Sequence, residues 1–150
     1  MTFVEGAPEG RRYGFFELFG MMVAISLDSH YRTYSVDQLG SYLIPPLDAR
    51  QFKIYLDERG RPGAFVTWAL VNDEHHRALR EEGINPPANQ WNSGPHLWFT
   101  DMVAPAGDVR AIVRDIQTNI FPDKHAHSIR RDSVGGIRRI CKWRNALSAG

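Results

Sequence analysis

Two side chains in this sequence stand where acid–base chemistry would be expected, His30 and Asp101. His30 follows an apolar segment and lies in the polar run 28–32. A neutral imidazole at a helix end suits a general base near pH 7. Asp101 lies in the apolar run 98–103, where a carboxylate must be paired, hydrogen-bonded or shifted in its pKa. A structural role, as a cap or as a brace for a loop, stays open for both residues.

The other candidates for catalysis or metal binding are weaker. His75 and His76 are adjacent, so on a helix their side chains point about 100° apart. His125 and His127 could share a metal in a strand, but no cysteine or carboxylate stands at a ligand spacing from them, and we expect no metal site. The single cysteine, Cys141, excludes an internal disulfide and a multi-cysteine metal site, and we expect a buried thiol there.

The turn Pro105-Ala106-Gly107-Asp108 joins a predicted strand to a predicted helix and is a third candidate site. A helix N-terminus that follows a glycine-containing turn favours anions. Because Gly107 is the one glycine of this turn and Asp108 is acidic, the turn suits the pyrophosphate of coenzyme A poorly. A single phosphodiester, such as that of the phosphopantetheine arm of an acyl carrier protein, makes smaller demands.

The hydrophobic periodicity predicts the elements that must position these residues. Helices are expected over 15–27, from Ser35 to the pair Pro45-Pro46, from Asn72 to Gly83, and over 109–120 after a cap at Asp108. Strands are expected over 52–56, 64–71, 97–104, 127–131 and 137–143.

The second helix has an apolar stripe of Val36, Leu39 and Leu43, and the proline pair ends it. The first two strands form an antiparallel hairpin, because turn residues fill the segment between them. The order of elements predicts an α/β fold in which helices flank a mixed sheet.

Length and composition fit one folded domain. The chain has 150 residues, of which 43% are hydrophobic and 23% charged. We expect a flexible lead over 1–12, a single domain over 13–145 and a tail over 146–150. The longest apolar stretch is far too short to span a bilayer, and no export signal opens the chain, so we expect a cytoplasmic protein.

Charge is unevenly distributed although the net charge is only +1. From Lys124 onward, Asp132 is the one acidic residue among several basic ones. A basic end of this kind suits an acidic protein, a phosphate-bearing ligand or nucleic acid, and it also suits a merely solvated face.

Taken in order along the chain, several motifs resemble the RTX toxin-activating lysine acyltransferases, which have a GNAT-like fold. The motif with most matching residues runs over 98–108, Trp-Phe-Thr-Asp-Met-Val-Ala-Pro-Ala-Gly-Asp. The others are Ser29-His30-Tyr31-Arg32, Ile44-Pro45-Pro46 before Gln51-Phe52, Gly60-Arg61-Pro62 with Thr67-Trp68-Ala69, Trp91-Asn92-Ser93-Gly94, Phe121-Pro122 and Ile129-Arg130-Arg131-Asp132.

The resemblance implies an enzyme that moves a fatty acyl group from an acyl carrier protein to a lysine amine of a protoxin. It places the catalytic pair at His30 and Asp101, and it implies no bound cofactor, the donor being the phosphopantetheine thioester of the carrier. The chain departs from the family in two respects. Leu27 replaces the serine that precedes the family's histidine by three residues, and the tail after Asp132 is short.

On this reading, the residues expected to bind substrate are Trp68, Trp98, Phe99, Ala106 and Gly107, although an ordinary core role stays open for the aromatic ones. The residues expected to bind the carrier are Arg130, Arg131, Arg138 and Arg139. The expected partners are the acyl carrier protein and a protoxin or precursor-peptide acceptor, with a homodimer as a further possibility, and nucleic acid is not expected.

Two alternatives to protoxin activation stay open. The same chemistry would serve to lipidate lysine or ornithine in a small ribosomal precursor peptide. A module without catalytic activity would instead use the basic end to bind an acyl carrier protein or nucleic acid.

Overall fold

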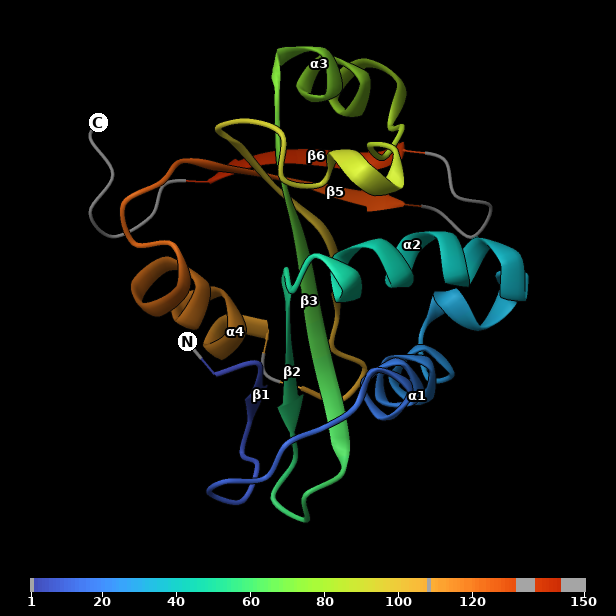
Figure 1. The fold of residues 1–150 in the computed structure, drawn as a ribbon, viewed down its shortest axis with the longest axis vertical. Coiled ribbons are helices and arrows are strands. Elements are labelled where there is room, and N and C mark those ends of the chain that lie inside the picture. The colour runs from blue at the N-terminus through green and yellow to red at the C-terminus, as the bar shows by residue number, and fades with distance from the viewer. Residues whose placement is uncertain (1, 108, 132–136, 144–150) are drawn as a thin grey trace.

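A six-stranded mixed sheet, in which the strands follow one another in chain order, organises the molecule (Figure 1). The computed structural model describes residues 2–107, 109–131 and 137–143, and within 137–143 the side chains of 140–142. The strands are β1 (Val4–Glu5), β2 (Phe52–Leu56), β3 (Pro62–Val71), β4 (His96–Val103), β5 (Ala126–Arg131) and β6 (Ile137–Trp143). Strands β1 and β2 are parallel, as are β4 and β5, and the other neighbours are antiparallel. The expected tail over 146–150 lies outside the described residues.

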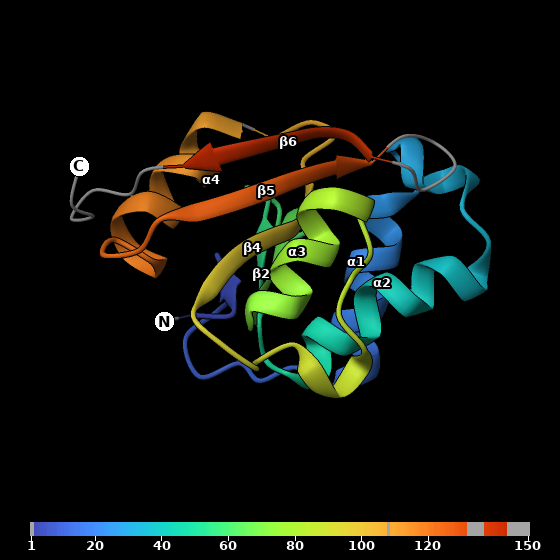
Figure 2. The same cartoon turned by 90° about the horizontal axis from the view of Figure 1, so that it is seen from above.

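Helices cover both faces of the sheet, which confirms the α/β fold expected from the sequence. They are α1 (Phe15–Ser26), α2 (Val36–Asp48), α3 (Asp73–Glu82) and α4 (Val109–Asp115), with a π-helical turn η3 (Ile116–Ile120) after α4 and short 3₁₀ turns η1 (His30–Thr33) and η2 (Ala88–Gln90). Figures 1 and 2 show α1 and α2 side by side, with α4 on the opposite side of the strands.

Each layer is held by a separate apolar cluster. On the α1–α2 side, Met22 and Leu43 pack with Phe65 of the sheet. On the α4 side, Ile112 and Ile116 pack against Val66 and its neighbours on the sheet. Successive residues of β3 therefore serve opposite layers, as the alternation of side chains along a strand requires.

The structure corrects three expectations for the N-terminal part of the chain. Val4 is buried and pairs with Ile54, so a short parallel strand takes the place of part of the flexible lead. The second helix continues to Asp48, because the carbonyl groups of Pro45 and Pro46 still accept hydrogen bonds from Ala49 and Gln51. Its apolar stripe does not include Val36, which lies at the first turn and is 89% exposed.

The two central parallel strands separate part-way along their length. Strands β4 and β5 pair from Leu97↔Ala126 to Phe99↔Ser128. Beyond Phe99, β4 continues beside β3, whereas β5 continues beside β6. The divergence opens a gap in the sheet between the end of β4 and the end of β5.

Candidate active site

A cavity of about 470 Å³ lies at the divergence of β4 and β5. Its lining residues come from both faces of the sheet and from the strands that diverge. They are residues 28–31 around η1, Phe99, Met102 and Val103 on β4, Ala104 and Pro105 after β4, Val109 and Val113 on α4, Ser128 to Arg131 on β5, and Cys141 on β6. Since η1 and α4 lie on opposite faces, we place the cavity through the gap in the sheet. One side of it is polar, around η1, and the other is apolar, against α4.

His30 lies at this cavity because the chain turns sharply after α1. Ser29 caps the turn: its hydroxyl accepts a hydrogen bond from the Tyr31 N–H at 3.1 Å and donates one to the Ser26 carbonyl at 2.8 Å. His30 is the first residue of η1, its side chain is exposed, and it lines the cavity. The imidazole is therefore accessible to a substrate that enters the gap.

Asp101 is buried inside the sheet, where two hydroxyl groups bind its carboxylate. One carboxylate oxygen accepts a hydrogen bond from the Tyr31 hydroxyl, and the other accepts one from Thr67 at 2.9 Å. A register shift between Thr67 and Trp68 makes room for the extra residue Thr100, whose hydroxyl hydrogen-bonds that of Thr67 at 2.7 Å. Bulges of this kind re-aim side chains next to functional sites.

Burial raises the pKa of the Asp101 carboxyl group. Desolvation raises the pKa of this carboxyl above its usual value, and the hydrogen bonds from Tyr31 and Thr67 act in the opposite direction. The positive charges of Arg131 and of protonated His30 also favour the carboxylate. Asp101 is thus a carboxylate whose ionisation depends on a few neighbouring groups.

Tyr31 contacts both candidate catalytic residues. Its hydroxyl binds Asp101, and its ring meets the His30 ring edge to face, with centroids 4.6 Å apart. Among the described residues, the Asp101 carboxylate has hydrogen bonds from Tyr31 and Thr67 and none from His30. Neither hydroxyl residue had a predicted role in the site. The available signal was that both stand in motifs of the family resemblance, Tyr31 beside His30 and Thr67 in the segment Thr67-Trp68-Ala69.

The predicted substrate residues fall into three groups. Phe99 lines the cavity, and Trp68 packs edge to face against it with ring centroids 6.4 Å apart. Trp98 lies with His76 and His127, its ring stacked on that of His127, and it does not line the cavity. Ala106 and Gly107 are exposed in the turn before α4, outside the cavity lining.

The predicted carrier-binding arginines also differ from one another. Arg130 is exposed and lines the cavity. Arg131 is 5% exposed, and its guanidinium donates to the Gly83 carbonyl at 2.6 Å and to the Asn85 side chain at 2.7 Å. We therefore leave Arg131 out of the carrier-binding surface, because its charge is engaged inside the fold. The side chains of 138 and 139 lie outside the described residues.

Three histidines gather at the other end of the sheet, with Trp98. His76 stacks on His96 at 4.0 Å and meets His127 at 5.1 Å, and Trp98 Nε1 donates to His76 Nδ1 at 2.9 Å. Burial lowers the pKa of His76, and it lowers that of His127 to about 4. In the described part of the chain, no group of three or more His, Cys, Asp or Glu side chains has an arrangement that could hold a metal ion.

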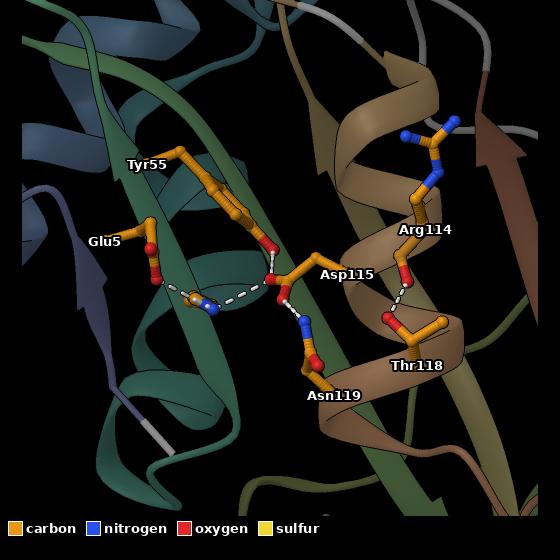
Figure 3. Close-up of polar contacts among 7 residues, drawn as sticks. Glu5, Tyr55, Arg114, Asp115, Thr118 and Asn119 are labelled. Atoms are coloured by element: carbon orange, nitrogen blue, oxygen red, sulfur yellow. Dashed lines mark hydrogen bonds and ion pairs between the residues drawn. The ribbon is translucent and has the colours of Figure 1, made fainter.

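The helix that forms the apolar wall is fastened to the sheet by an ion pair. Asp115, at the end of α4, accepts hydrogen bonds from Lys53 Nζ at 2.7 Å and from the Tyr55 hydroxyl at 2.6 Å (Figure 3). Glu5 contacts the same ammonium at 3.2 Å, and Asn119 donates to the second oxygen of Asp115. Burial would raise the pKa of Asp115, but these hydrogen bonds outweigh it and lower the pKa.

A larger groove of about 1040 Å³ lies beneath the N-terminal loop, between residues 2–13 and the segment 47–52. It contains neither His30 nor Asp101 and no residue that contacts them through the side chains described above. We therefore assign the chemistry to the smaller cavity between β4 and β5. None of the helices within the described ranges has the length and apolar composition needed to span a membrane.

Comparison with known proteins agrees with the resemblance seen in the sequence. The sequence pattern of the RTX toxin acyltransferase family matches residues 11–144. An uncharacterised protein of Synechocystis sp. is 33% identical over 71% of this chain and 73% of its own length. The lysine-acyltransferase RtxC of Vibrio cholerae is 30% identical over 68% of this chain and 67% of its own length. The RTX-I toxin-activating lysine-acyltransferase ApxIC of Actinobacillus pleuropneumoniae is 28% identical over 85% of this chain and 74% of its own length.

Proposed function

Since this chain belongs to the RTX toxin acyltransferase family, we propose that it transfers a fatty acyl group from the phosphopantetheine thioester of an acyl carrier protein to a lysine side chain of a protoxin. Family membership makes the chain an acyltransferase. The lysine acceptor is proposed by likeness to the relatives from Vibrio and Actinobacillus, whose names describe lysine acyltransferases.

The observation that carries the proposal is the position of His30 in the cavity between the diverging strands. An acyl transfer needs a place where a thioester and an amine meet beside a base. The exposed imidazole lies on the polar side of the cavity, and Phe99, Val109 and Val113 line the apolar side. An acyl chain against the apolar side would leave the thioester carbonyl toward His30.

The chemistry asked of His30 is the removal of a proton from the acceptor amine. The amine nitrogen forms a bond to the thioester carbonyl carbon, and the carbon–sulfur bond breaks. His30 takes the proton that the nitrogen loses, and the leaving thiolate takes a proton in turn. The Asp101 carboxylate supports the positive charge that His30 acquires in this step.

The choice of a protein-borne donor rests on charge. An acyl carrier protein is acidic, and the exposed guanidinium of Arg130 lies at the cavity. The exposed turn at Ala106 and Gly107 offers no glycine-rich cradle for a pyrophosphate. A single phosphate near Arg130 demands less of the protein than coenzyme A would.

The test is intact-mass analysis of lysine-containing peptides incubated with acyl carrier proteins that bear different acyl chains. The wild-type chain should add one acyl group to lysine. His30→Ala should slow the transfer by at least about 10²-fold, which is the range of a lost general base. His75→Ala removes an imidazole from α3, outside the cavity, and serves as the matched control with an unchanged rate.

Three results would count against parts of this proposal. A wild-type rate in His30→Ala would remove His30 from the mechanism. An equal rate with acyl-coenzyme A would refute the preference for a carrier-borne donor. Faster modification of ornithine than of lysine, in peptides that otherwise match, would favour a precursor-peptide acceptor over a protoxin.

A further inference from the structure

We propose that Tyr31 is a positioning residue for this transfer, fixing the Asp101 carboxylate behind His30 through its hydroxyl group. The inference rests on the proposed function, because it assigns to Tyr31 a part in the same reaction. It differs from a direct His30–Asp101 pair, because the link between the two residues runs through the phenol.

The first support is the way the carboxylate is held. Tyr31 is 5% exposed and Asp101 2% exposed, so water does not take the place of either partner. The Tyr31 hydroxyl donates to one oxygen and Thr67 donates to the other. With a donor on each oxygen, the orientation of the carboxylate is fixed from both sides.

The second support is the way the Tyr31 ring is held. One side of the ring stacks on Tyr34, with centroids 4.8 Å apart and planes 19° from parallel. Tyr34 in turn contacts Tyr42 at 5.6 Å. The Tyr31 ring also has the edge-to-face contact with His30, and the hydrogen bond from the Tyr31 N–H to the Ser29 hydroxyl holds the backbone of Tyr31 in place. The hydroxyl therefore cannot turn away from Asp101 without disrupting this stack.

The third support is electrostatic. The groups that face Asp101 are His30 and Tyr31 from η1, Thr67 from β3 and the buried Arg131 from β5, with Tyr34 behind Tyr31. Desolvation raises the pKa of Asp101, and the Tyr31 hydrogen bond lowers it. Loss of the hydroxyl therefore raises this pKa further. A protonated Asp101 would no longer support the imidazolium of His30.

The test is a double-mutant cycle of Tyr31→Phe and Asp101→Asn, which keeps both side-chain shapes. In the wild-type background Tyr31→Phe should lower kcat about tenfold, as expected for a lost hydrogen bond to a charged group. In the Asp101→Asn background the same change should lower kcat less than about twofold, because residues that act as one unit are not additive. Equal losses in both backgrounds would overturn the inference.

The pH profile gives a readout that a merely structural role would not move. Transfer needs both unprotonated His30 and ionised Asp101, so the acidic limb of kcat/KM reports both groups, and a higher Asp101 pKa in Tyr31→Phe should move that limb to higher pH or make it steeper. Incorporation of 3-fluorotyrosine at position 31, a stronger donor of nearly the same size, should move the limb to lower pH. Tyr42→Phe removes a hydroxyl from the same aromatic group without contact to Asp101, and it should leave the limb unchanged. An unchanged limb in both Tyr31 variants would overturn the inference.

A measurement without substrate separates this inference from the proposed function. The pKa of Asp101 is measured by NMR titration of the chain labelled with carboxyl-¹³C aspartate, and it should be higher in Tyr31→Phe than in the wild type. An equal pKa in the two proteins overturns the inference. A higher pKa in the variant, together with no transfer by the wild type, would count against the proposed function alone.

Discussion

The charge of Asp101 in the interior of a sheet depends on two neutral hydroxyl groups. A buried carboxylate without partners would cost several kcal/mol or would take up a proton. Tyr31 and Thr67 reduce that cost without adding a charge of their own, so the negative charge stays available to His30. A lysine or arginine in direct contact with Asp101 would have neutralised it instead.

Cys141 allows the cavity to be tested, because it is the single thiol of the chain and lines the gap. A bulky maleimide on Cys141 should block acyl transfer by filling the cavity, and a methylthio group from a methanethiosulfonate should inhibit much less. An acyl-loaded carrier present during labelling should slow the reaction of the thiol. The measurements are the extent of labelling by intact mass and the residual rate of transfer.

Cys141→Ala is the control for modification elsewhere. The maleimide should leave the rate of this variant at its untreated value. Full activity of the wild-type chain after complete labelling would show that the donor does not use the cavity. The thiol is only half-buried, in contrast to the buried thiol expected from the sequence.

Individual site residues could be predicted from the sequence only where their polarity conflicted with the surrounding residues. Asp101 in an apolar run and His30 in a sudden polar run meet that condition. Thr67 does not, since threonine is ordinary in a strand. Its contact with Asp101 depends on the register shift at Thr67 and Trp68, and the register of two strands is a property of their pairing.

At the scale of elements, the joint between α4 and β2 controls one wall of the cavity. Helix α4 has seven residues, too few to be stable alone. It contributes Val109 and Val113 to the cavity, and Asp115 at its end fastens it to Lys53 and Tyr55 (Figure 3). The position of the wall therefore depends on an ion pair outside the cavity.

Lys53→Met should destabilise the protein, because it removes the ammonium and leaves the Asp115 carboxylate partly buried. We expect a loss of about 2–3 kcal/mol in the free energy of unfolding, below the cost for a fully buried pair, since Tyr55 and Asn119 still donate to Asp115. The measurement is urea denaturation followed by circular dichroism.

The matched control for the ion pair is Arg61→Met, which breaks the exposed pair with Asp57 in the β2–β3 turn. Exposed pairs contribute less than about 1 kcal/mol, so this variant should stay close to the wild type. Equal losses in the two variants would mean that the Lys53 pair behaves as a surface pair and does not fasten α4.

Long elements could be predicted from the sequence better than short ones. The positions of β2 and β3, their antiparallel pairing and the caps of α3 at Asn72 and Gly83 agree with the structure. Strand β1 has two residues, too few to show any period, and its pairing with β2 depends on tertiary contacts. The pair Pro45-Pro46 predicts a stop, because a proline has no N–H to donate within the helix. In the structure Leu47 is buried, the carbonyl groups of Pro45 and Pro46 accept hydrogen bonds, and the helix continues.

At the scale of the whole molecule, the arrangement of the sheet determines where a donor can enter. The α/β class followed from the order of elements, but the divergence of β4 and β5 could not be predicted. Strands β4 and β5 stop pairing after Phe99, which is where the register of β3 and β4 shifts, while β5 stays paired with β6. The sequence shows which segments are strands, and only the folded structure shows where two of them separate.

Arg130→Glu should weaken the productive encounter with an acidic carrier, because it reverses an exposed charge at the cavity. We expect a higher KM for the loaded carrier and a weaker dependence of kcat/KM on salt concentration. The kcat at saturation should change little, since Arg130 is not asked to touch the reacting carbonyl. Steady-state kinetics at several salt concentrations measures both effects.

Arg77→Glu makes an equal change of charge on α3, which contributes no residue to the cavity. Its KM and salt dependence should stay at the wild-type values. An equal rise of KM in both variants would point to the net charge of the molecule and away from a local contact at Arg130.

The burial of Lys53 has a consequence for an enzyme whose proposed target is lysine. Among the 18 Lys and Arg residues of the chain, the lysines are Lys53, Lys124 and Lys142. The Lys53 side chain is 5% exposed, and its nitrogen lies between Asp115 and Glu5, so a thioester in solution has little access to it. The lysine that secures the cavity wall is thereby shielded from the acylation that the enzyme is proposed to carry out.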